Sequence, residues 1–311
     1  MTMGQRLNRA APFAVALGIW FFPVPAGLTA EAWHLFAVFA AAIASVLIGA
    51  FPLLTASMLA VGAIVLTGTI KPEQAYSGFA NSSVLLVVIA FIVAQAVVKS
   101  GLGRRVSLFM VSRFGGSSLG LAYSIVLTDA AIAPAFPSNT ARGGVLYPIV
   151  LSVAKGAGSN PDDPEGRRLG GYLMFCSMAG LAVSSALWMT ATSANPVAVL
   201  IVQQAGLEID FGKWLLASAV PSLIAIGLLP LIVAKLFPPR VGKTPGAPAA
   251  ARKELAGMGP MSREEWITAG TFVLMVAGWI FGNQLQLNTT SVTYIVIQDR
   301  PPRPAARRSP T

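Results

Sequence analysis

Charged residues are scarce in this sequence: Asp, Glu, Lys and Arg make up 11% of its 311 residues. Soluble domains carry charge on about a quarter of their residues. A chain this poor in charge cannot cover a globular surface with polar groups, which excludes an ordinary water-soluble domain. Hydrophobic residues make up 55% of the chain, and its mean hydropathy is +0.69. The composition therefore predicts that lipid surrounds much of the protein.

Cysteine and histidine are almost missing as well. The single cysteine, Cys176, excludes an intrachain disulfide, and its place inside an apolar run predicts a small packing residue. The single histidine, His34, is weak support for a proton-coupling group. The sequence shows no metal-ligand spacing, no catalytic triad pattern and no Gly-rich phosphate loop. We therefore expect neither an enzyme nor a bound cofactor.

The formal net charge of +10 would suggest nucleic acid as the partner of a soluble protein. Here the basic residues fall in short clusters between apolar runs, as in cytoplasmic loops of membrane proteins, so we expect no nucleic-acid partner. Arg6 and Arg9 precede the first run, which we interpret as an uncleaved span rather than a signal peptide. The predicted location is a bacterial inner membrane, with many spans and a cytoplasmic N-terminus.

Several apolar runs approach the roughly 20 residues that a spanning helix needs. They cover residues 11–24, 33–50, 53–69, 84–98, 119–135, 143–153, 171–190, 214–237 and 266–285. The pair at 119–135 and 143–153 is too broken for ordinary spans. The basic clusters share one side whether this pair dips in and out or crosses twice, so charge leaves both topologies open.

Two irregular polar segments interrupt these runs. Residues 128–144 hold two prolines, two adjacent glycines and an arginine where membrane depth is expected. Irregular backbone is tolerated there only if it is buried in protein or lines a wet cavity. We interpret this segment as a re-entrant hairpin that turns at Pro137 to Thr140. A second break, Thr190 to Pro196, is expected to split one span into half-helices, a common way for carriers to build a substrate site.

The hairpin tip carries Ser138, Asn139 and Thr140. An amide and a hydroxyl at this place can donate to a carboxylate, and the start of the following helix favours an anion. These residue types are also ordinary helix N-caps. Their position between prolines and glycines at membrane depth favours substrate binding.

Arg142 and Asp129 are charges at the same predicted depth. A buried arginine is a functional candidate by default, so Arg142 is a candidate substrate ligand. It can equally form a structural ion pair with Asp129, and Asp129 can instead coordinate a cation or relay a proton. Both alternatives stand on sequence alone.

The second break supplies another polar set, Thr192, Ser193 and Asn195. Its hydroxyls and carbonyls suit Na⁺, and the half-helix that follows suits an anion. Pro196 is also simply favourable at the start of a helix. Na⁺ is thus a possible coupling ion at Ser138, Asn139 and this break, with Asp129 as a charge-compensating residue.

The stretch Pro137-Ser-Asn-Thr-Ala-Arg-Gly-Gly-Val-Leu-Tyr-Pro-Ile-Val150, with Thr192-Ser-Ala-Asn-Pro196 downstream, resembles the divalent anion:sodium symporter family. The Ala-Arg-Gly-Gly continuation is most similar to the 2-oxoglutarate/malate translocators and the citrate/succinate and tartrate exchangers. The resemblance extends to about Thr290. It implies a homodimer of inverted-repeat protomers that move small dicarboxylates or tricarboxylates by an elevator-like motion, with Asn139 and Thr140 matching the first of two Ser-Asn-Thr motifs.

The sequence departs from the family pattern in two places. No second Ser-Asn-Thr motif occurs, and the last residues, 291–311, are Arg- and Pro-rich, so a truncated, non-transporting fragment is one expectation. Pro134 stands where sodium-coupled relatives often have a serine. Together with Arg142, this favours anion exchange over a Na⁺-coupled dicarboxylate, citrate or sulfate symporter, which is the alternative.

The predicted fold is an all-α polytopic membrane protein with a re-entrant hairpin and a broken helix, the first part of an inverted-repeat carrier. Residues 1–116 are expected to form scaffold spans. Residues 117–238 are expected to form the transport element, with the hairpin at 117–155, the broken span at 170–206 and a further span at 213–237. A cytoplasmic linker at 239–263, a scaffold span at 264–290 and a disordered tail at 291–311 complete the division.

Overall fold

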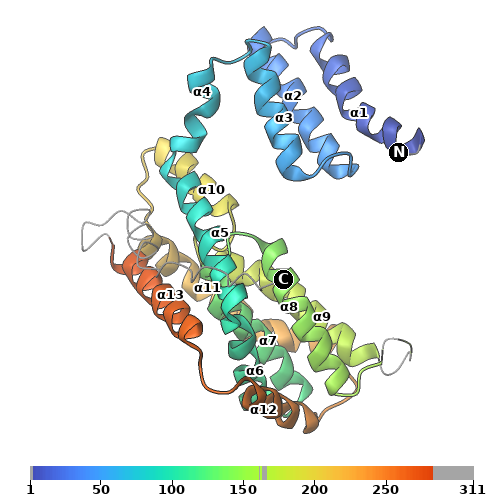
Figure 1. The fold of residues 1–311 in the computed structure, drawn as a ribbon, viewed down its shortest axis with the longest axis vertical. Helices are drawn as coiled ribbons and strands as arrows, with labels where there is room; N and C mark the ends of the chain where they lie inside the picture. Colours follow the sequence, from blue (N-terminus) through green and yellow to red (C-terminus); the bar gives the residue numbers. More distant parts are fainter. Residues whose placement is uncertain (1–2, 161, 163–166, 283–311) are drawn as a thin grey trace, which may run out of the picture. The chain divides into compact units, whose positions relative to one another are not determined.

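The computed structural model describes residues 3–160, 162 and 167–282, and the named secondary-structure elements within them are helices (Figure 1). The predicted all-α class is confirmed. The predicted tail, 291–311, and the end of the last predicted span, 283–290, lie outside the described residues. The chain divides into two compact units, residues 1–81 and 82–311.

The smaller unit consists of helices joined by short connections. It contains α1 (Met3–Trp20), α2 (Ala30–Leu47), α3 (Leu53–Leu66), α4 (Pro72–Tyr76) and the 3₁₀ helix η1 (Ser77–Ala80). Thr29 caps α2 by accepting a hydrogen bond from the backbone N–H of Ala32 at 3.2 Å. Outward-facing Phe39, Leu47 and Leu54 are mostly exposed, which fits a surface that lipid covers.

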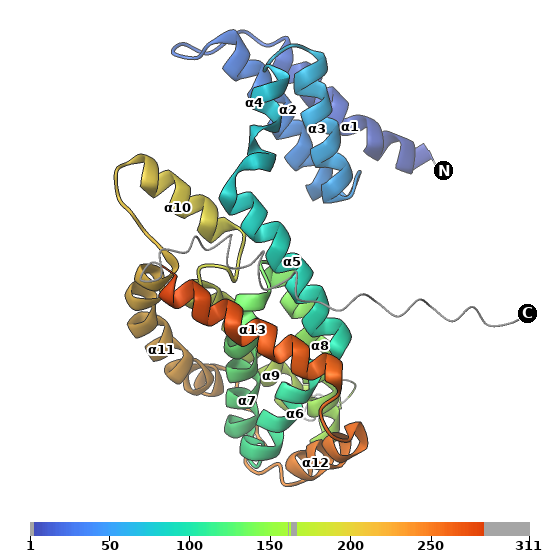
Figure 2. The same cartoon turned by 60° about the vertical axis from the view of Figure 1, so that its left-hand side comes forward.

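The larger unit contains the remaining helices, which Figure 2 shows from a second side. They are α5 (Ser82–Ser100), α6 (Leu102–Phe114), α7 (Ser118–Ile132), η2 (Ala133–Ala135), α8 (Asn139–Gly156), α9 (Arg167–Leu187), α10 (Ala194–Gln204), α11 (Phe211–Leu236), α12 (Gly246–Met258) and α13 (Arg263–Phe281). α9 packs against α7, α8 and α11, so it forms the centre of this unit.

Four helical segments in the described part of the chain are long and apolar enough to cross a membrane: Ala30–Leu47, Ser118–Ala135, Arg168–Leu187 and Phe211–Leu236. The bent pair Pro72–Ala80 and Val84–Ser100 makes a fifth if it is one span. α3 is apolar but has 14 residues, fewer than the roughly 20 of a straight crossing. The protein is therefore a polytopic helical membrane protein.

α7 and α8 form a helical hairpin whose base lies beside α12. Ser118, at the start of α7, donates to the carbonyl oxygen of Val241. The carbonyl oxygen of Gly156, at the end of α8, lies next to Gly246. The predicted turn is present, since helix stops after Ala135 and resumes at Asn139. Both ends of the hairpin thus lie at one end of the larger unit; whether it is re-entrant remains a prediction.

The predicted break in the next span is also present. α9 ends at Leu187 and α10 begins at Ala194, so the break starts two residues and ends three residues before the predicted one. Asn195 holds the break by donating through Nδ2 to the carbonyl oxygens of Ser185 at 2.8 Å and Trp188 at 3.2 Å. These two bonds satisfy carbonyl groups that the end of α9 would otherwise leave without partners.

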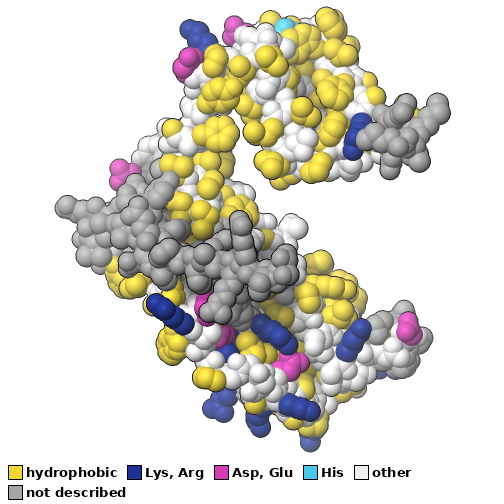
Figure 3. Space-filling model, viewed as in Figure 1, with side chains coloured by type: hydrophobic (Ala, Val, Ile, Leu, Met, Phe, Trp, Pro, Cys, Tyr) yellow, Lys and Arg dark blue, Asp and Glu magenta, His cyan; other side chains and the backbone are white. Residues whose placement is uncertain are grey.

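The end of the larger unit at the base of the α7–α8 hairpin carries many basic side chains, as Figure 3 shows around α6 and α12. We call it the basic end. Arg105 of α6 donates to both carboxylate oxygens of Glu265, from Nε at 2.7 Å and from Nη2 at 3.0 Å. Glu265 also accepts from the backbone N–H of Ser262, completing a capping box that starts α13. The hydrogen bonds from Arg105 lower the pKa of Glu265 below its usual value.

Candidate functional site

The tip of the α7–α8 hairpin exposes polar groups at the first turn of α8. Ser138 is the N-cap of this helix, and its Oγ accepts from the backbone N–H of Ala141 at 3.3 Å. The ordinary capping role considered from sequence is therefore present. Asn139 and Thr140 follow directly and are exposed. The tip thus offers an amide and a hydroxyl beside the positive end of a helix dipole.

The α9–α10 break lies against this tip. The backbone N–H of Ser193 donates to the carbonyl oxygen of Pro137 at 3.0 Å, and the hydroxyl of Thr190 donates to the carbonyl oxygen of Pro134 at 2.9 Å. Two segments far apart in sequence are thereby joined at their irregular parts. Each satisfies backbone groups of the other, which is the condition for irregular backbone in a membrane protein.

Arg142 lies directly behind Asn139 and is fully buried. Its Nη2 donates to Asn139 Oδ1 at 2.9 Å, to the carbonyl oxygen of Leu181 at 2.8 Å and to Ser185 Oγ at 2.6 Å. Ser185 itself donates to Asn139 Oδ1. With Oδ1 held from behind by two donors, the Nδ2 group of Asn139 is the part of the amide free to face an exposed ligand.

Asp129 on α7 is the counter-charge of Arg142. Its Oδ1 lies 3.5 Å from Arg142 Nε, and its Oδ2 accepts from Ser184 Oγ. Both charged side chains are at most 1% exposed. The ion pair considered from sequence is therefore formed. Its geometry is incomplete, because Asp129 Oδ1 and the Nε and Nη1 atoms of Arg142 make no hydrogen bond.

The structure gathers most of the residues that the sequence singled out. Ser138, Asn139 and Thr140 share the tip with Ser193, which is exposed, while Arg142 and Asp129 lie behind it. Thr192 is half-buried at the break, and Asn195 uses both amide N–H groups to hold the break together. The functional roles assigned to these residues remain predictions.

Sequence reasoning missed Ser184 and Ser185 of α9. Ser184 binds Asp129, and Ser185 connects Arg142 with Asn139, so each hydroxyl serves one partner of the ion pair. The sequence did hold a signal, because adjacent serines deep in a spanning helix need hydrogen-bonding partners nearby. Their position in the chain gave no way to tell that these partners are 43 to 55 residues away.

The fold and this site define a helical membrane protein in which a hairpin tip and a broken span converge. The chain matches the family model described as the sodium:sulfate symporter transmembrane region over residues 4–298. It belongs to that family, which confirms the resemblance to the divalent anion:sodium symporters. The family and its named relatives are membrane transporters, not enzymes.

Three relatives show how far the similarity extends. The chain is 38% identical over 284 residues to the putative malate transporter YflS of Bacillus subtilis, covering 91% of this chain and 59% of that protein. It is 38% identical over 287 residues to dicarboxylate transporter 1, chloroplastic, of Arabidopsis thaliana, covering 92% and 52%. It is 36% identical over 293 residues to inner membrane protein YbhI of Escherichia coli, covering 91% and 61%. The chain thus spans about half to three fifths of the length of these relatives.

Proposed function

We propose that the protein serves secondary active transport of small dicarboxylates or tricarboxylates across a bacterial inner membrane, by anion exchange of the 2-oxoglutarate/malate or citrate/succinate type. The observation that carries this is Asn139. Its amide oxygen is held by buried Arg142 and Ser185, and its side chain is exposed at a helix start. The dicarboxylate and malate transporters among the relatives supply the substrate class.

The tip residues take the carboxylate. Ser138, Asn139 and Thr140 donate through hydroxyl and amide groups, and the start of α8 adds its dipole. Arg142 does not reach the exposed surface, so it acts from behind by fixing the amide. The second carboxylate of the substrate needs donors beyond this tip.

Charge balance favours exchange. Arg142 and Asp129 carry opposite charges, so their pair does not neutralise a bound dianion. Moving one elementary charge across 100 mV costs about 2.3 kcal/mol, so net movement of an uncompensated dianion into a negative interior is unfavourable. Exchange of one dianion for another moves no net charge. Exchange therefore needs no coupled cation.

Na⁺-coupled symport is the second candidate. The Ser193 N–H contact to Pro137 brings the hydroxyls and carbonyls of the break next to those of the tip, a set of oxygens that suits Na⁺. In this version Asp129 compensates the charge of Na⁺, and the cation is held by Ser138, Asn139, Thr192, Ser193 and Asn195.

Counterflow in proteoliposomes separates these candidates. The purified chain is reconstituted with internal unlabelled malate and offered labelled 2-oxoglutarate, with and without Na⁺. Exchange predicts uptake that requires internal anion and ignores Na⁺. Uptake that needs a Na⁺ gradient and no internal anion supports symport, and silence from correctly inserted protein contradicts transport by this chain.

Asn139→Ala tests the site itself. A hydrogen bond to a charged group contributes about 1.5–3 kcal/mol, so we expect roughly a 10- to 100-fold loss of uptake at low substrate concentration. Thr67→Ala, which removes an exposed hydroxyl at the end of α3, is the matched control and should leave uptake unchanged. Equal uptake by the two variants would remove the tip from the substrate site.

The cytoplasmic orientation of the basic end, and with it a cytoplasmic N-terminus, is part of this proposal. Basic residues near membrane helices favour the cytoplasmic side. Lys243 lies at this end, beside Ser117. Because the natural Cys176 is buried, a Lys243→Cys variant gives one accessible thiol. Labelling by an impermeant reagent in inverted but not right-side-out vesicles is the expected result. The implied homodimer is tested by cross-linking in the same vesicles.

A further inference from the structure

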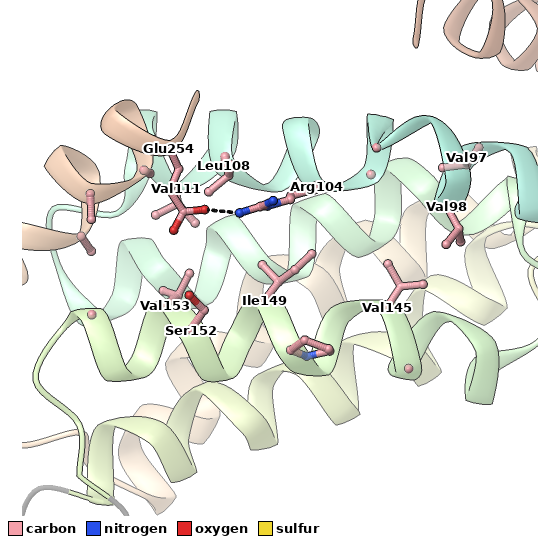
Figure 4. A pocket seen from close by; sticks show the side chains of 18 of the residues that line it. Val97, Val98, Arg104, Leu108, Val111, Val145, Ile149, Ser152, Val153 and Glu254 are labelled. Carbon is pink, nitrogen blue, oxygen red and sulfur yellow. Dashed lines mark hydrogen bonds and ion pairs between the residues drawn. The ribbon is translucent and has the colours of Figure 1, made fainter. Parts of the chain in front are cut away.

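An apolar groove of about 480 Å³ lies between α6 and α8 in the larger unit (Figure 4). The ends of α5 and α12 help to line it. Branched and small side chains dominate its walls: Val98, Leu108, Val145, Ile149, Val153 and Ala251. Gly144 widens the groove, since a Cβ placed there would meet no atom within 4 Å. The groove is therefore a real gap between helices that otherwise pack in one unit.

A charged pair lies at the side of this apolar groove. Arg104 of α6 donates through Nη2 to Glu254 of α12 at 2.8 Å, and Figure 4 shows both side chains beside the groove. The two side chains are 60% and 43% exposed. Arg113 of α6 and Lys253 of α12 are also exposed at this basic end of the unit. The apolar walls and the basic side chains around them are complementary to an amphiphile with a negatively charged headgroup.

The size of the groove selects among apolar occupants. Its volume falls in the range of sites for small ligands. A single acyl chain is narrow enough and matches the aliphatic walls. Basic pockets between helices near the cytoplasmic surface are a known setting for anionic lipid headgroups.

We propose that an anionic phospholipid docks in this groove, with one acyl chain between α6 and α8 and its phosphate at Arg104. The guanidinium has five N–H groups, and the bond to Glu254 engages only Nη2. Glu254 competes with the phosphate for this cation. Exposed ion pairs contribute little to stability, so an arriving phosphate can displace or share the contact.

Native mass spectrometry of the detergent-purified chain, titrated with palmitoyl-oleoyl phosphatidylglycerol or phosphatidylcholine, tests the headgroup. One basic residue predicts about a fivefold preference for phosphatidylglycerol. Arg104→Gln should abolish this preference, whereas Arg113→Gln, the same change further along α6, should keep it. Glu254→Gln should raise it, because the competing carboxylate is gone. Equal effects of Arg104→Gln and Arg113→Gln, or loss of preference in Glu254→Gln, would overturn the proposal.

Gly144→Leu tests the acyl chain. A Cβ at this position meets no atom within 4 Å, and the new side chain should weaken binding of both lipids severalfold. Gly227→Leu in α11 is the control, since its Cβ also meets no atom and it does not line the groove. Identical lipid binding by these two variants would show that the groove is not the site. These measurements read lipid binding directly and do not depend on transport.

Discussion

Among the arginine–carboxylate pairs in the described part of the larger unit, two are built in opposite ways. Arg105 and Glu265 meet through two short hydrogen bonds at the basic end, and the carbonyl oxygen of Gly259 accepts from Arg105 Nη1 at 3.0 Å. Arg142 and Asp129 lie behind the hairpin tip at 3.5 Å without a hydrogen bond between them. The more deeply buried pair is the less completely satisfied one.

Under the proposed function, this difference separates a structural arrangement from one that serves the substrate site. The satisfied pair of Arg105 and Glu265 has one favoured geometry and holds helices in place. A buried pair with unbonded N–H groups costs free energy, which a fold usually avoids by pairing or hydrogen-bonding its charges. Arg142 instead directs its bonds to Asn139, Ser185 and Leu181. The ion pair of Arg142 and Asp129 is thus incomplete at the place where Arg142 positions the amide of Asn139.

The largest effect is expected when the buried pair loses one partner. Asp129→Asn leaves Arg142 as an uncompensated buried charge and should destabilise the protein by about 3–5 kcal/mol. The double variant Asp129→Leu/Arg142→Met should recover much of this loss, since it removes both charges. Thermal unfolding in detergent, followed by a thiol-reactive dye on buried Cys176, measures both. Equal loss in the single and double variants would contradict the pairing.

An intermediate effect is expected at the satisfied pair, and it depends on pH. Hydrogen bonds from Arg105 lower the pKa of Glu265, so the folded state binds its proton less readily than the unfolded state. The stabilisation is complete above the unfolded pKa of about 4.3 and is lost as pH falls through the lower folded pKa. Glu265→Gln should lower Tm by a few degrees at pH 7, about 2–4 °C.

Melting curves between pH 7 and pH 3 check this sign. The gap in Tm between the parent protein and Glu265→Gln should shrink as the pH falls below about 4.3. A gap that stays constant across this range would show that the negative charge of Glu265 is not what holds α6 to α13.

The smallest effect is expected at the exposed pair Arg104–Glu254. Arg104→Gln should change the free energy of unfolding by less than about 0.5 kcal/mol, because exposed ion pairs contribute little. Chemical unfolding in lipid-free detergent measures this change. A loss as large as that of Glu265→Gln would mean that ion pairs at the basic end act as one network.

Sequence reasoning located the irregular segments well, because prolines, glycines and polar residues clustered inside an apolar run are rarely compatible with a continuous spanning helix. It placed the turn at Pro137 to Thr140 and the break at Thr190 to Pro196, close to where helices α8 and α10 begin. It considered the Asp129–Arg142 pair, since a buried charge demands a partner. It could not show that Arg142 faces inward to Asn139, because helix rotation is set by packing against α9.

Contacts between distant helices were beyond the same reasoning. The sequence-based boundary at residue 116 separates predicted scaffold from predicted transport element. The contacts between helices instead place α5 and α6 in the larger unit. This grouping does not test the predicted roles of residues 1–116 as scaffold and 117–238 as transport element. Charges alone gave no reason to pair Arg105 of α6 with Glu265 of α13 rather than with another charged residue.

The bonds at the base of the hairpin also impose an order in time on the growing chain. Thr244 donates from its hydroxyl to the carbonyl oxygen of Gly115 and from its N–H to that of Gly116, a reach of 129 residues for the first bond. The partner of Arg105, Glu265, is synthesised later still. The ribosome therefore delivers α7 to α11 into the membrane before the turn that starts α7 meets its partners. Until then the basic end stays open, so its closure follows the insertion of α7 to α11.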